Sequence, residues 1–318
     1  MQVPEALRKK VQEIASSMSA GELRAAAQRL TEVYRQEAGP PPLRTEAERI
    51  AYALVRMPAT YAAVRSALSA TSECLPGWEP TSMLDLGSGP GTAVWAVAEQ
   101  FTRLQCVIAL EREAAFTQLA SRLAEGLRFS TEWTTADLHR WTPARKHDLV
   151  LAAYSIGELS ADARRRLISA AWEACTGTVV LVEPGTRRGF GVIVEAREQL
   201  ISLGAAIVAP CPHELACPMK LAGDWCHFSA RVERTAEHRR LKQGELGHED
   251  EKFSYVAATR LSSEKAKARI VRHPQRFSGF TKLQLCTPEG LQQVTVTRSQ
   301  KEKYRAVKRA DWGSAWND

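Results

Sequence analysis

The sequence contains no hydrophobic run that approaches the about 20 apolar residues needed to cross a membrane. We also expect no secretory signal. Residues 1–17 carry two glutamates and no long apolar stretch, and acids are equally untypical of an organelle transit peptide. Only seven cysteines occur in 318 residues, and in such a chain we expect metal ligands or core residues rather than disulfides. We therefore expect a cytoplasmic, monomeric protein that does not bind membranes.

Before residue 266 the chain has no net excess of either charge. Residues 266–318 hold eleven Lys and Arg against four Asp and Glu, an excess equal to the +7 of the whole chain. A basic segment with interleaved aromatic residues favours an anionic partner, and we expect RNA rather than a membrane. The predicted RNA contacts are Arg272, Arg276, Lys282, Lys301, Lys303, Arg305, Lys308 and Arg309. Tyr304, Trp312 and Trp316 could stack on unpaired bases; the alternative is a solvated surface with aromatics in the core.

A glycine-rich stretch, MLDLGSGPG at residues 83–91, organises the rest of the chain. It is neither the dinucleotide fingerprint G-x-G-x-x-G nor a phosphate-binding loop ending in Gly-Lys-Ser/Thr. The pattern predicts a buried strand, a tight turn and a helix that begins at Thr92. With the acid before the glycines it resembles motif I of class I S-adenosylmethionine (SAM) methyltransferases. We predict that Asp85, Gly87, Gly89 and Gly91 bind the cofactor, the alternative being an ordinary strand-to-helix turn.

Further candidate cofactor contacts follow the next three predicted strands. Glu111 ends a strand over residues 104–110, where such folds place a carboxylate for the ribose hydroxyls. Asp137, with Leu138 beside it, follows a strand over 130–135 and could accept from the adenine amino group or cap a helix. Tyr154 follows a strand over 148–153, and with Glu158 it would line the pocket mouth or make a structural hydrogen bond.

Strands alternate with helices over the middle of the chain, with further strands at 178–182, 205–209 and 253–259. This predicts an α/β fold with a mostly parallel, Rossmann-like sheet of the class I SAM methyltransferase type. We divide the chain into an N-terminal helical section (1–75), a methyltransferase-like domain (76–265) with a cysteine-rich insertion (210–230), and a basic C-terminal β module (266–318). Gly39 and the prolines at 40–42 predict a linker, and Pro58 should interrupt a helix over 45–71.

Four cysteines lie outside apolar stretches, namely Cys211, Cys217, Cys226 and Cys286. Four thiolates could hold Zn²⁺ or an iron–sulfur cluster. Gaps of five and eight residues favour an iron–sulfur cluster, because structural zinc sites usually take closely spaced pairs. Zinc and unligated thiols remain alternatives, and His213 or His227 could replace Cys286. We expect the remaining cysteines, Cys74, Cys106 and Cys175, to be buried and inert.

Taken together, these features resemble the ribosomal small-subunit methyltransferase-like family called Rsm twenty-two in yeast and methyltransferase-like seventeen in humans. The resemblance implies binding to the small ribosomal subunit during its assembly, a retained SAM site and a four-cysteine [4Fe–4S] cluster. On this chain it implies cofactor contacts by Asp85 and the three motif glycines. The residues that carry it are 52–61 with RMPA at 56–59, 84–91, 153–154, 158–159, VEPGT at 182–186, APCPH at 209–213, 217–218, 226–228, EKFSYV at 251–256, Cys286, 304–305 and 312–313.

The acceptor side of the pocket lacks familiar catalytic motifs. Residues 152–155 read AAYS where amine-directed nucleic-acid methyltransferases often have Asn-Pro-Pro-Tyr, and Glu183-Pro184 follows the fifth strand without a nucleophilic cysteine. No catalytic residue can be named. A radical-SAM enzyme is excluded because C-x₃-C-x₂-C is missing. We predict a SAM-binding, iron–sulfur protein that binds the small subunit and its 16S-type rRNA and aids assembly or translation; the alternative is an active SAM-dependent rRNA methyltransferase.

Overall fold

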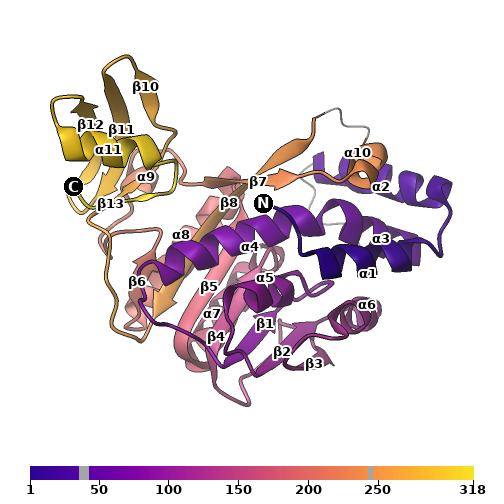
Figure 1. Cartoon of the computed structure of the whole chain (residues 1–318). Helices are drawn as coiled ribbons and strands as arrows, with labels where there is room; N and C mark the ends of the chain where they lie inside the picture. Colours follow the sequence, from indigo (N-terminus) through magenta and orange to yellow (C-terminus); the bar gives the residue numbers. More distant parts are fainter. Residues whose placement is uncertain (36–42, 243–245) are drawn as a thin grey trace.

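The computed structural model describes residues 1–35, 43–242 and 246–318 (Figure 1). The linker predicted at 39–42 lies outside these residues. No helix in the described part of the chain is both long enough and apolar enough to cross a membrane.

The centre of the described structure is an eight-stranded sheet. Seven of its strands follow the order β3-β2-β1-β4-β5-β8-β6, and the eighth, β7, pairs with β8 outside this order. Strands β1 to β5 pair in parallel, whereas β8 runs antiparallel to both β5 and β6. This arrangement confirms the predicted fold class. The strands are β1 (Ser82–Leu86), β2 (Cys106–Glu111), β3 (Ser130–Thr135), β4 (His147–Ala153), β5 (Cys175–Pro184), β6 (Ala206–Ala209) and β8 (His248–Thr259).

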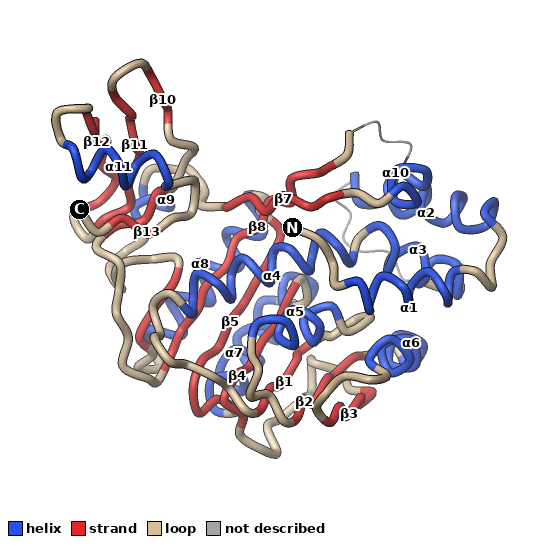
Figure 2. Tube along the Cα trace, in the orientation of Figure 1, coloured by secondary structure: helices blue, strands red, loops and turns tan. Residues whose placement is uncertain are grey.

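The sheet is covered on both faces, because its central strands are apolar on both. In β4, Leu149 and Leu151 face one core while Val150 and Ala152 face the other. The first core is shared with the N-terminal helices, and the second with α7 and α8 (Figures 1 and 2). The covering helices within the sheet region are α5 (Thr92–Gln100), α6 (Ala114–Ala124), α7 (Ala161–Glu173) and α8 (Arg187–Ser202).

The N-terminal helices pack in the same hydrophobic core as the sheet. They are α1 (Glu5–Ala15), α2 (Ala20–Arg35), α3 (Glu46–Val55) and α4 (Met57–Ser72). A capping box begins α2, where the Ser19 hydroxyl accepts from the Glu22 N–H at 3.2 Å and the Glu22 carboxylate accepts from the Ser19 N–H at 3.0 Å. The helix predicted over 45–71 is two helices, because Pro58 occupies the first turn of α4.

One strand of the main sheet was not predicted from the sequence. β7 (Phe228–Glu233) pairs antiparallel with the first half of β8, so that this pair extends beyond the rest of the sheet. In the chain, the short helix α9 (Pro218–Leu221) precedes β7 and α10 (Ala236–Lys242) follows it. A further short helix, η1 (Ile156–Glu158), lies between β4 and α7.

The C-terminal residues form a separate small antiparallel sheet with one helix, at the end of the molecule away from α1–α3 (Figures 1 and 2). A hairpin joins β11 and β12 through residues 287–290. Trp316 is only 5% exposed and packs with Ile270, Leu283 and Val307, so it belongs to the core and cannot stack on a base. The elements are β9 (Ala268–Ile270), β10 (Gln275–Phe277), β11 (Phe280–Thr287), β12 (Gly290–Thr297), α11 (Lys301–Arg309) and β13 (Ala315–Trp316).

Candidate functional site

The glycine-rich turn after β1 adopts a backbone conformation that other residues rarely take. Gly87, Gly89 and Gly91 have φ of 82°, 51° and 81°. A Cβ at Gly87 would lie 2.5 Å from the Ser155 Cβ, and one at Gly91 would lie 2.7 Å from the Trp133 ring. Nothing lies within 4 Å of a Cβ placed at Gly89. Two of the glycines are therefore needed for packing, while Gly89 leaves open space beside the turn.

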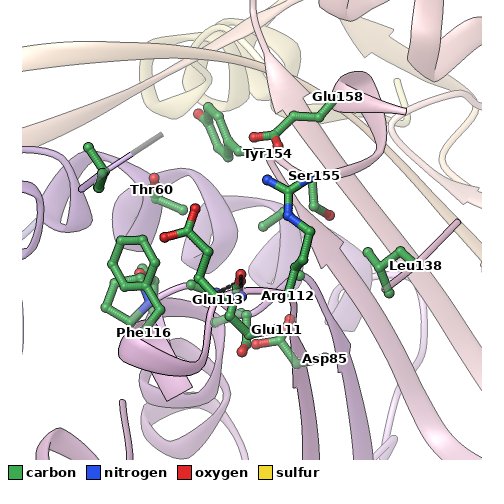
Figure 3. Close-up of a pocket in the computed structure, with 18 of the residues that line it drawn as sticks. Thr60, Asp85, Glu111, Arg112, Glu113, Phe116, Leu138, Tyr154, Ser155 and Glu158 are labelled. Atoms are coloured by element: carbon green, nitrogen blue, oxygen red, sulfur yellow. Dashed lines mark hydrogen bonds between the residues drawn. The ribbon is translucent and has the colours of Figure 1, made fainter. Parts of the chain in front are cut away.

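That open space belongs to a pocket of about 440 Å³ at the carboxyl ends of β1, β2 and β4 (Figure 3). Gly91 does not line the pocket; it is the N-cap residue of α5. Sequence reasoning missed Arg112, Glu113 and Phe116, which follow β2 and also line the pocket. The other seven predicted cofactor residues all line it: Asp85, Gly87, Gly89, Glu111, Asp137, Leu138 and Tyr154.

Asp85 is the most deeply buried acid of this pocket. Its side chain is about 1% exposed, and its Oδ2 has no hydrogen-bond partner. Burial, with a smaller contribution from the nearby Glu111 carboxylate, raises the pKa of Asp85 to about 8. An uncompensated carboxyl at the end of a strand is costly, so it suits a site at which a ligand supplies the missing partner.

Two backbone N–H groups hold the Glu111 carboxylate in place. Its carboxylate accepts from the N–H groups of Gly89 and Glu113, both at 2.9 Å. Each carboxylate oxygen can accept a further hydrogen bond, so the group remains able to bind a diol.

Asp137 stabilises a turn and caps no helix. Its carboxylate accepts from the His139 N–H at 3.0 Å and lies 2.9 Å from the His139 Nδ1. These hydrogen bonds lower the pKa of Asp137. The helix-cap alternative is therefore wrong, because residues 138–140 form a turn and not a helix.

Tyr154 stands at the pocket wall in a strained conformation, with φ of 58°, the one positive φ at a non-glycine residue in the described ranges. Its hydroxyl donates to the Glu251 carboxylate at 2.8 Å, and that carboxylate lies 3.8 Å from the Arg56 guanidinium. Burial, together with Glu251, raises the pKa of Tyr154 well above its usual range, so the phenol stays a neutral donor. No motif in the sequence indicates that residues 56 and 251 meet here.

Glu158 lies on the far side of the pocket from Asp85, and the Arg112 side chain extends between them (Figure 3). Burial raises the pKa of Glu158 to about 7, an effect that Arg112 opposes and that Glu111 and Glu113 reinforce. In the ligand-free pocket Asp85 and Glu158 are therefore not fully ionised at neutral pH, and a cation bound beside them would lower both pKa values.

The four predicted ligand cysteines line one small cavity of about 30 Å³ between the main sheet and β11. Cys211 follows β6, Cys217 precedes α9, Cys226 precedes β7 and Cys286 lies in β11. The Cys286 Sγ lies 3.7 Å from the His213 Nε2. Among the residues that the structure describes, no three His, Cys, Asp or Glu side chains are grouped as a metal site. The ligand set therefore stays a prediction, and so does the choice of metal.

Two arginines border this cavity without any carboxylate partner among the described residues. Arg197 is 2% exposed and donates to the carbonyl oxygens of His213 and Leu215. Arg269 is 1% exposed and donates to those of Pro210 and Gly313. Each retains one buried nitrogen without a partner. Two buried, uncompensated positive charges require negative charge nearby.

The other cysteines differ from this set. Cys74 and Cys175 are buried, as predicted, and burial raises the pKa of Cys175 to about 12. Cys106 at the start of β2 is partly exposed, contrary to the prediction, because its strand neighbours leave one face open there.

Most of the predicted RNA-binding cations are exposed, but two of them make contacts within the protein. Arg272 is partly buried and forms an ion pair with Asp224, and Arg276 donates to the Ala310 carbonyl oxygen at 2.7 Å. The remaining six are exposed: Lys282 on β11 and Lys301, Lys303, Arg305, Lys308 and Arg309 on α11.

The chain is similar to two kinds of curated protein. The ribosome assembly protein METTL17, mitochondrial, of Homo sapiens is 29% identical over 293 residues, which cover 85% of this chain and 62% of that protein. The Rsm22-cox11 tandem protein 2, mitochondrial, of Schizosaccharomyces pombe is 24% identical over 327 residues, covering 85% and 43%. The chain therefore spans less than two thirds of the length of these relatives.

Solved structures with a similar fold include two methyltransferases. The magnesium protoporphyrin IX methyltransferase of Synechocystis PCC 6803 with bound SAM gives a TM-score of 0.41 at 13% identity, covering 73% of this chain and 91% of that one. A SAM-dependent methyltransferase from Aquifex aeolicus gives 0.41 at 12% identity, covering 65% and 95%.

The expected cytoplasmic location is contradicted, because these curated relatives are mitochondrial. The expectation rested on the composition of residues 1–17. A compartment is specified by an address segment that a receptor reads, and neither the charge nor the composition of a folded domain determines it.

The family model described as "Mitochondrial small ribosomal subunit Rsm22" matches residues 46–317, which is most of the chain. The match includes the glycine-rich turn, all four cysteines of the cavity and the basic helix α11. The chain therefore belongs to the Rsm22 family.

Proposed function

We propose that this protein is a SAM-binding, methyltransferase-like assembly factor of the small ribosomal subunit, and that its four cavity cysteines hold a [4Fe–4S] cluster. The observation that carries the proposal is the position of the cysteine cavity. It joins the sheet that bears the cofactor pocket to the module that bears the exposed cations. The names of the human and yeast relatives, a ribosome assembly protein and Rsm22-containing proteins, support the same role.

The cofactor part of the proposal is supported by the pocket. The open space at Gly89 allows a ligand to approach the backbone, and the turn leads into the N-terminus of α5. In this proposal Glu111 accepts from the ribose hydroxyls and Asp137 from the adenine amino group. Asp85 and Tyr154 then face the methionine end of the ligand, and Leu138 packs beside the adenine.

The residues around the cysteine cavity fit an anionic metal centre. A [4Fe–4S]²⁺ cluster with four thiolates carries two negative charges, as does Zn²⁺ with four thiolates. Either would compensate the buried charges of Arg197 and Arg269. The wide cysteine spacing favours the cluster over zinc. Bound there, the centre would supply folding energy that fastens β11 to the main sheet.

The cluster can be tested by replacing Cys286 with Ser and measuring iron, zinc and the visible absorption of protein purified without oxygen. We expect the Cys286→Ser protein to lose most of its iron, and the matched Cys106→Ser protein, altered outside the cavity, to keep it. Full retention of iron by Cys286→Ser would contradict the ligand assignment, and zinc in place of iron in the unaltered protein would contradict the cluster.

The RNA-facing part of the proposal concerns α11. Five of its nine residues are exposed Lys or Arg, and the one fully buried side chain, Val307, fixes its opposite face to the small sheet. Such a row of cations can contact phosphates without reading sequence.

The decisive experiment maps modified nucleotides of small-subunit rRNA in cells with and without this protein. Intact modification with accumulating immature subunits would support the assembly factor. A single missing methyl group would instead establish the alternative, an active rRNA methyltransferase. Mature subunits at normal levels with every methyl group present would contradict both.

A further inference from the structure

The cofactor pocket has a strong excess of acidic side chains. One arginine, Arg112, is the only Lys or Arg among the described residues that line it, and His139 is paired with Asp137. The five acids that line the pocket are Asp85, Glu111, Glu113, Asp137 and Glu158. An acidic cluster alone can be a solvated surface, so the position of each carboxyl group decides what it can do.

Asp85 distinguishes this pocket from a solvated cluster. Its carboxyl group is buried, lines the cavity and leaves Oδ2 without a partner. Glu158, on the opposite wall, has no described hydrogen bond or ion pair to its carboxylate and is opposed only by Arg112. Two poorly compensated carboxyl groups therefore face the same 440 Å³ space from two sides. Such an arrangement stabilises a cation placed between them.

We propose that the pocket selects its ligand by charge and holds the sulfonium SAM in preference to the neutral sulfide S-adenosylhomocysteine. The inference rests on the proposed cofactor site and deepens it. The two ligands share the adenine, the ribose and the amino-acid end, so contacts to those groups cannot separate them. They differ in one methyl group and one positive charge on sulfur, and the acidic walls respond to the charge.

This preference has a functional consequence. An enzyme that turns over must release its sulfide product, which a charge-selective pocket also does. In a protein without a described acceptor motif, however, the same preference makes occupancy follow the ratio of sulfonium to sulfide. The protein would then be loaded, and its pocket ordered, only where methyl donor is plentiful.

The test is calorimetric titration of the intact protein with three ligands: SAM, S-adenosylhomocysteine, and sinefungin, which carries an ammonium group in place of the sulfonium. We expect SAM and sinefungin to bind about tenfold more tightly than the sulfide, since one charge between partly screened carboxylates contributes on this scale. Equal affinity for SAM and the sulfide would overturn the inference while leaving the cofactor site intact. Failure of all three ligands to bind would overturn the cofactor site itself.

A variant pair assigns the effect to the pocket walls. Glu158→Gln should bring the ratio of the two affinities to within a few-fold of one, because it removes one of the two carboxylates. Glu99→Gln, at the exposed end of α5 and outside the pocket, should leave the ratio unchanged. The sinefungin comparison uses the unaltered protein, so it remains decisive if Glu158→Gln does not fold. An unchanged ratio in a folded Glu158→Gln protein would count against the assignment.

Discussion

Asp85→Asn should make the ligand-free protein more stable while weakening its cofactor site. The wild-type carboxyl group is about 1% exposed, has no partner for Oδ2 and faces Glu111. Asn has nearly the same shape and no charge. The substitution therefore removes the electrostatic cost of the buried carboxylate with little change in packing.

The sign and size of the change in the free energy of unfolding follow from the pKa of Asp85. Burial raises the pKa of Asp85 from 3.8 to about 8 in the folded protein, so folding takes up a proton between these values. The stability that this proton confers is complete below pH 3.8 and is lost as the pH rises through 8. At about 1.4 kcal/mol per pKa unit, the cost above pH 8 is at most about 6 kcal/mol. The Asn amide is also buried without a partner, which offsets part of this gain. We therefore expect Asp85→Asn to raise the free energy of unfolding above pH 8 by about 2 kcal/mol.

The assay is urea unfolding of both proteins at about pH 5 and about pH 8.5. We expect the free energy of unfolding of Asp85→Asn to exceed that of the wild type by an amount that grows with pH. Asp137→Asn is the matched control, because hydrogen bonds lower the pKa of Asp137 and its replacement should destabilise the protein. The reasoning is refuted if Asp85→Asn is less stable than wild type at the higher pH, or if its gain does not depend on pH.

Three further predictions concern the turn, the basic helix and the cavity. Gly87→Ala should cost about 2–3 kcal/mol in thermal unfolding, because the new Cβ meets Ser155 at 2.5 Å, whereas Gly89→Ala should cost about 1 kcal/mol and abolish SAM binding. Reversing the charges of Lys301, Lys303 and Arg305 together should weaken binding to the small subunit and reduce the salt dependence of that binding. The control variant, with the charges of the exposed Arg103, Arg122 and Arg145 reversed, should bind as the wild type does. Arg269→Met should lower the iron content per chain, measured by elemental analysis, because a charge beside the proposed centre is lost.

The parts of the fold that the sequence predicts well have strong local signals. The apolar runs of β1 and β4 are largely buried on both faces, and the glycines after β1 are required by local geometry. β7 was missed for the opposite reason. Its partner in β8 begins with the polar residues 248–252, and the pair is held partly by an exposed ion pair between Arg231 and Asp250. β7 has one exposed face and therefore no continuous hydrophobic run; its signal is the alternation of the buried Phe228, Ala230 and Val232 with polar residues.

The candidate pocket could be predicted where its residues lie at the carboxyl ends of parallel strands. Asp85 and Glu111 lie at the carboxyl ends of β1 and β2, Asp137 follows β3, and the carboxyl ends of those strands meet at one edge. The contact of Tyr154 with Glu251 could not be predicted in this way, because it joins residues 97 positions apart and depends on where the polar half of β8 lies.

The arrangement of β8 explains why a cysteine-rich insertion stands between β6 and β8 of the main sheet. Glu251 of this strand accepts from Tyr154 at the pocket wall, and three residues later the Ser254 hydroxyl donates to the Cys226 carbonyl oxygen at 2.8 Å. On the other side of the cavity Arg269, from the first strand of the small sheet, donates to the Pro210 carbonyl oxygen. The cavity therefore lies where these three parts of the chain meet. A metal centre held by the cavity cysteines, as proposed, would fasten the basic module to the strand that also supports the pocket.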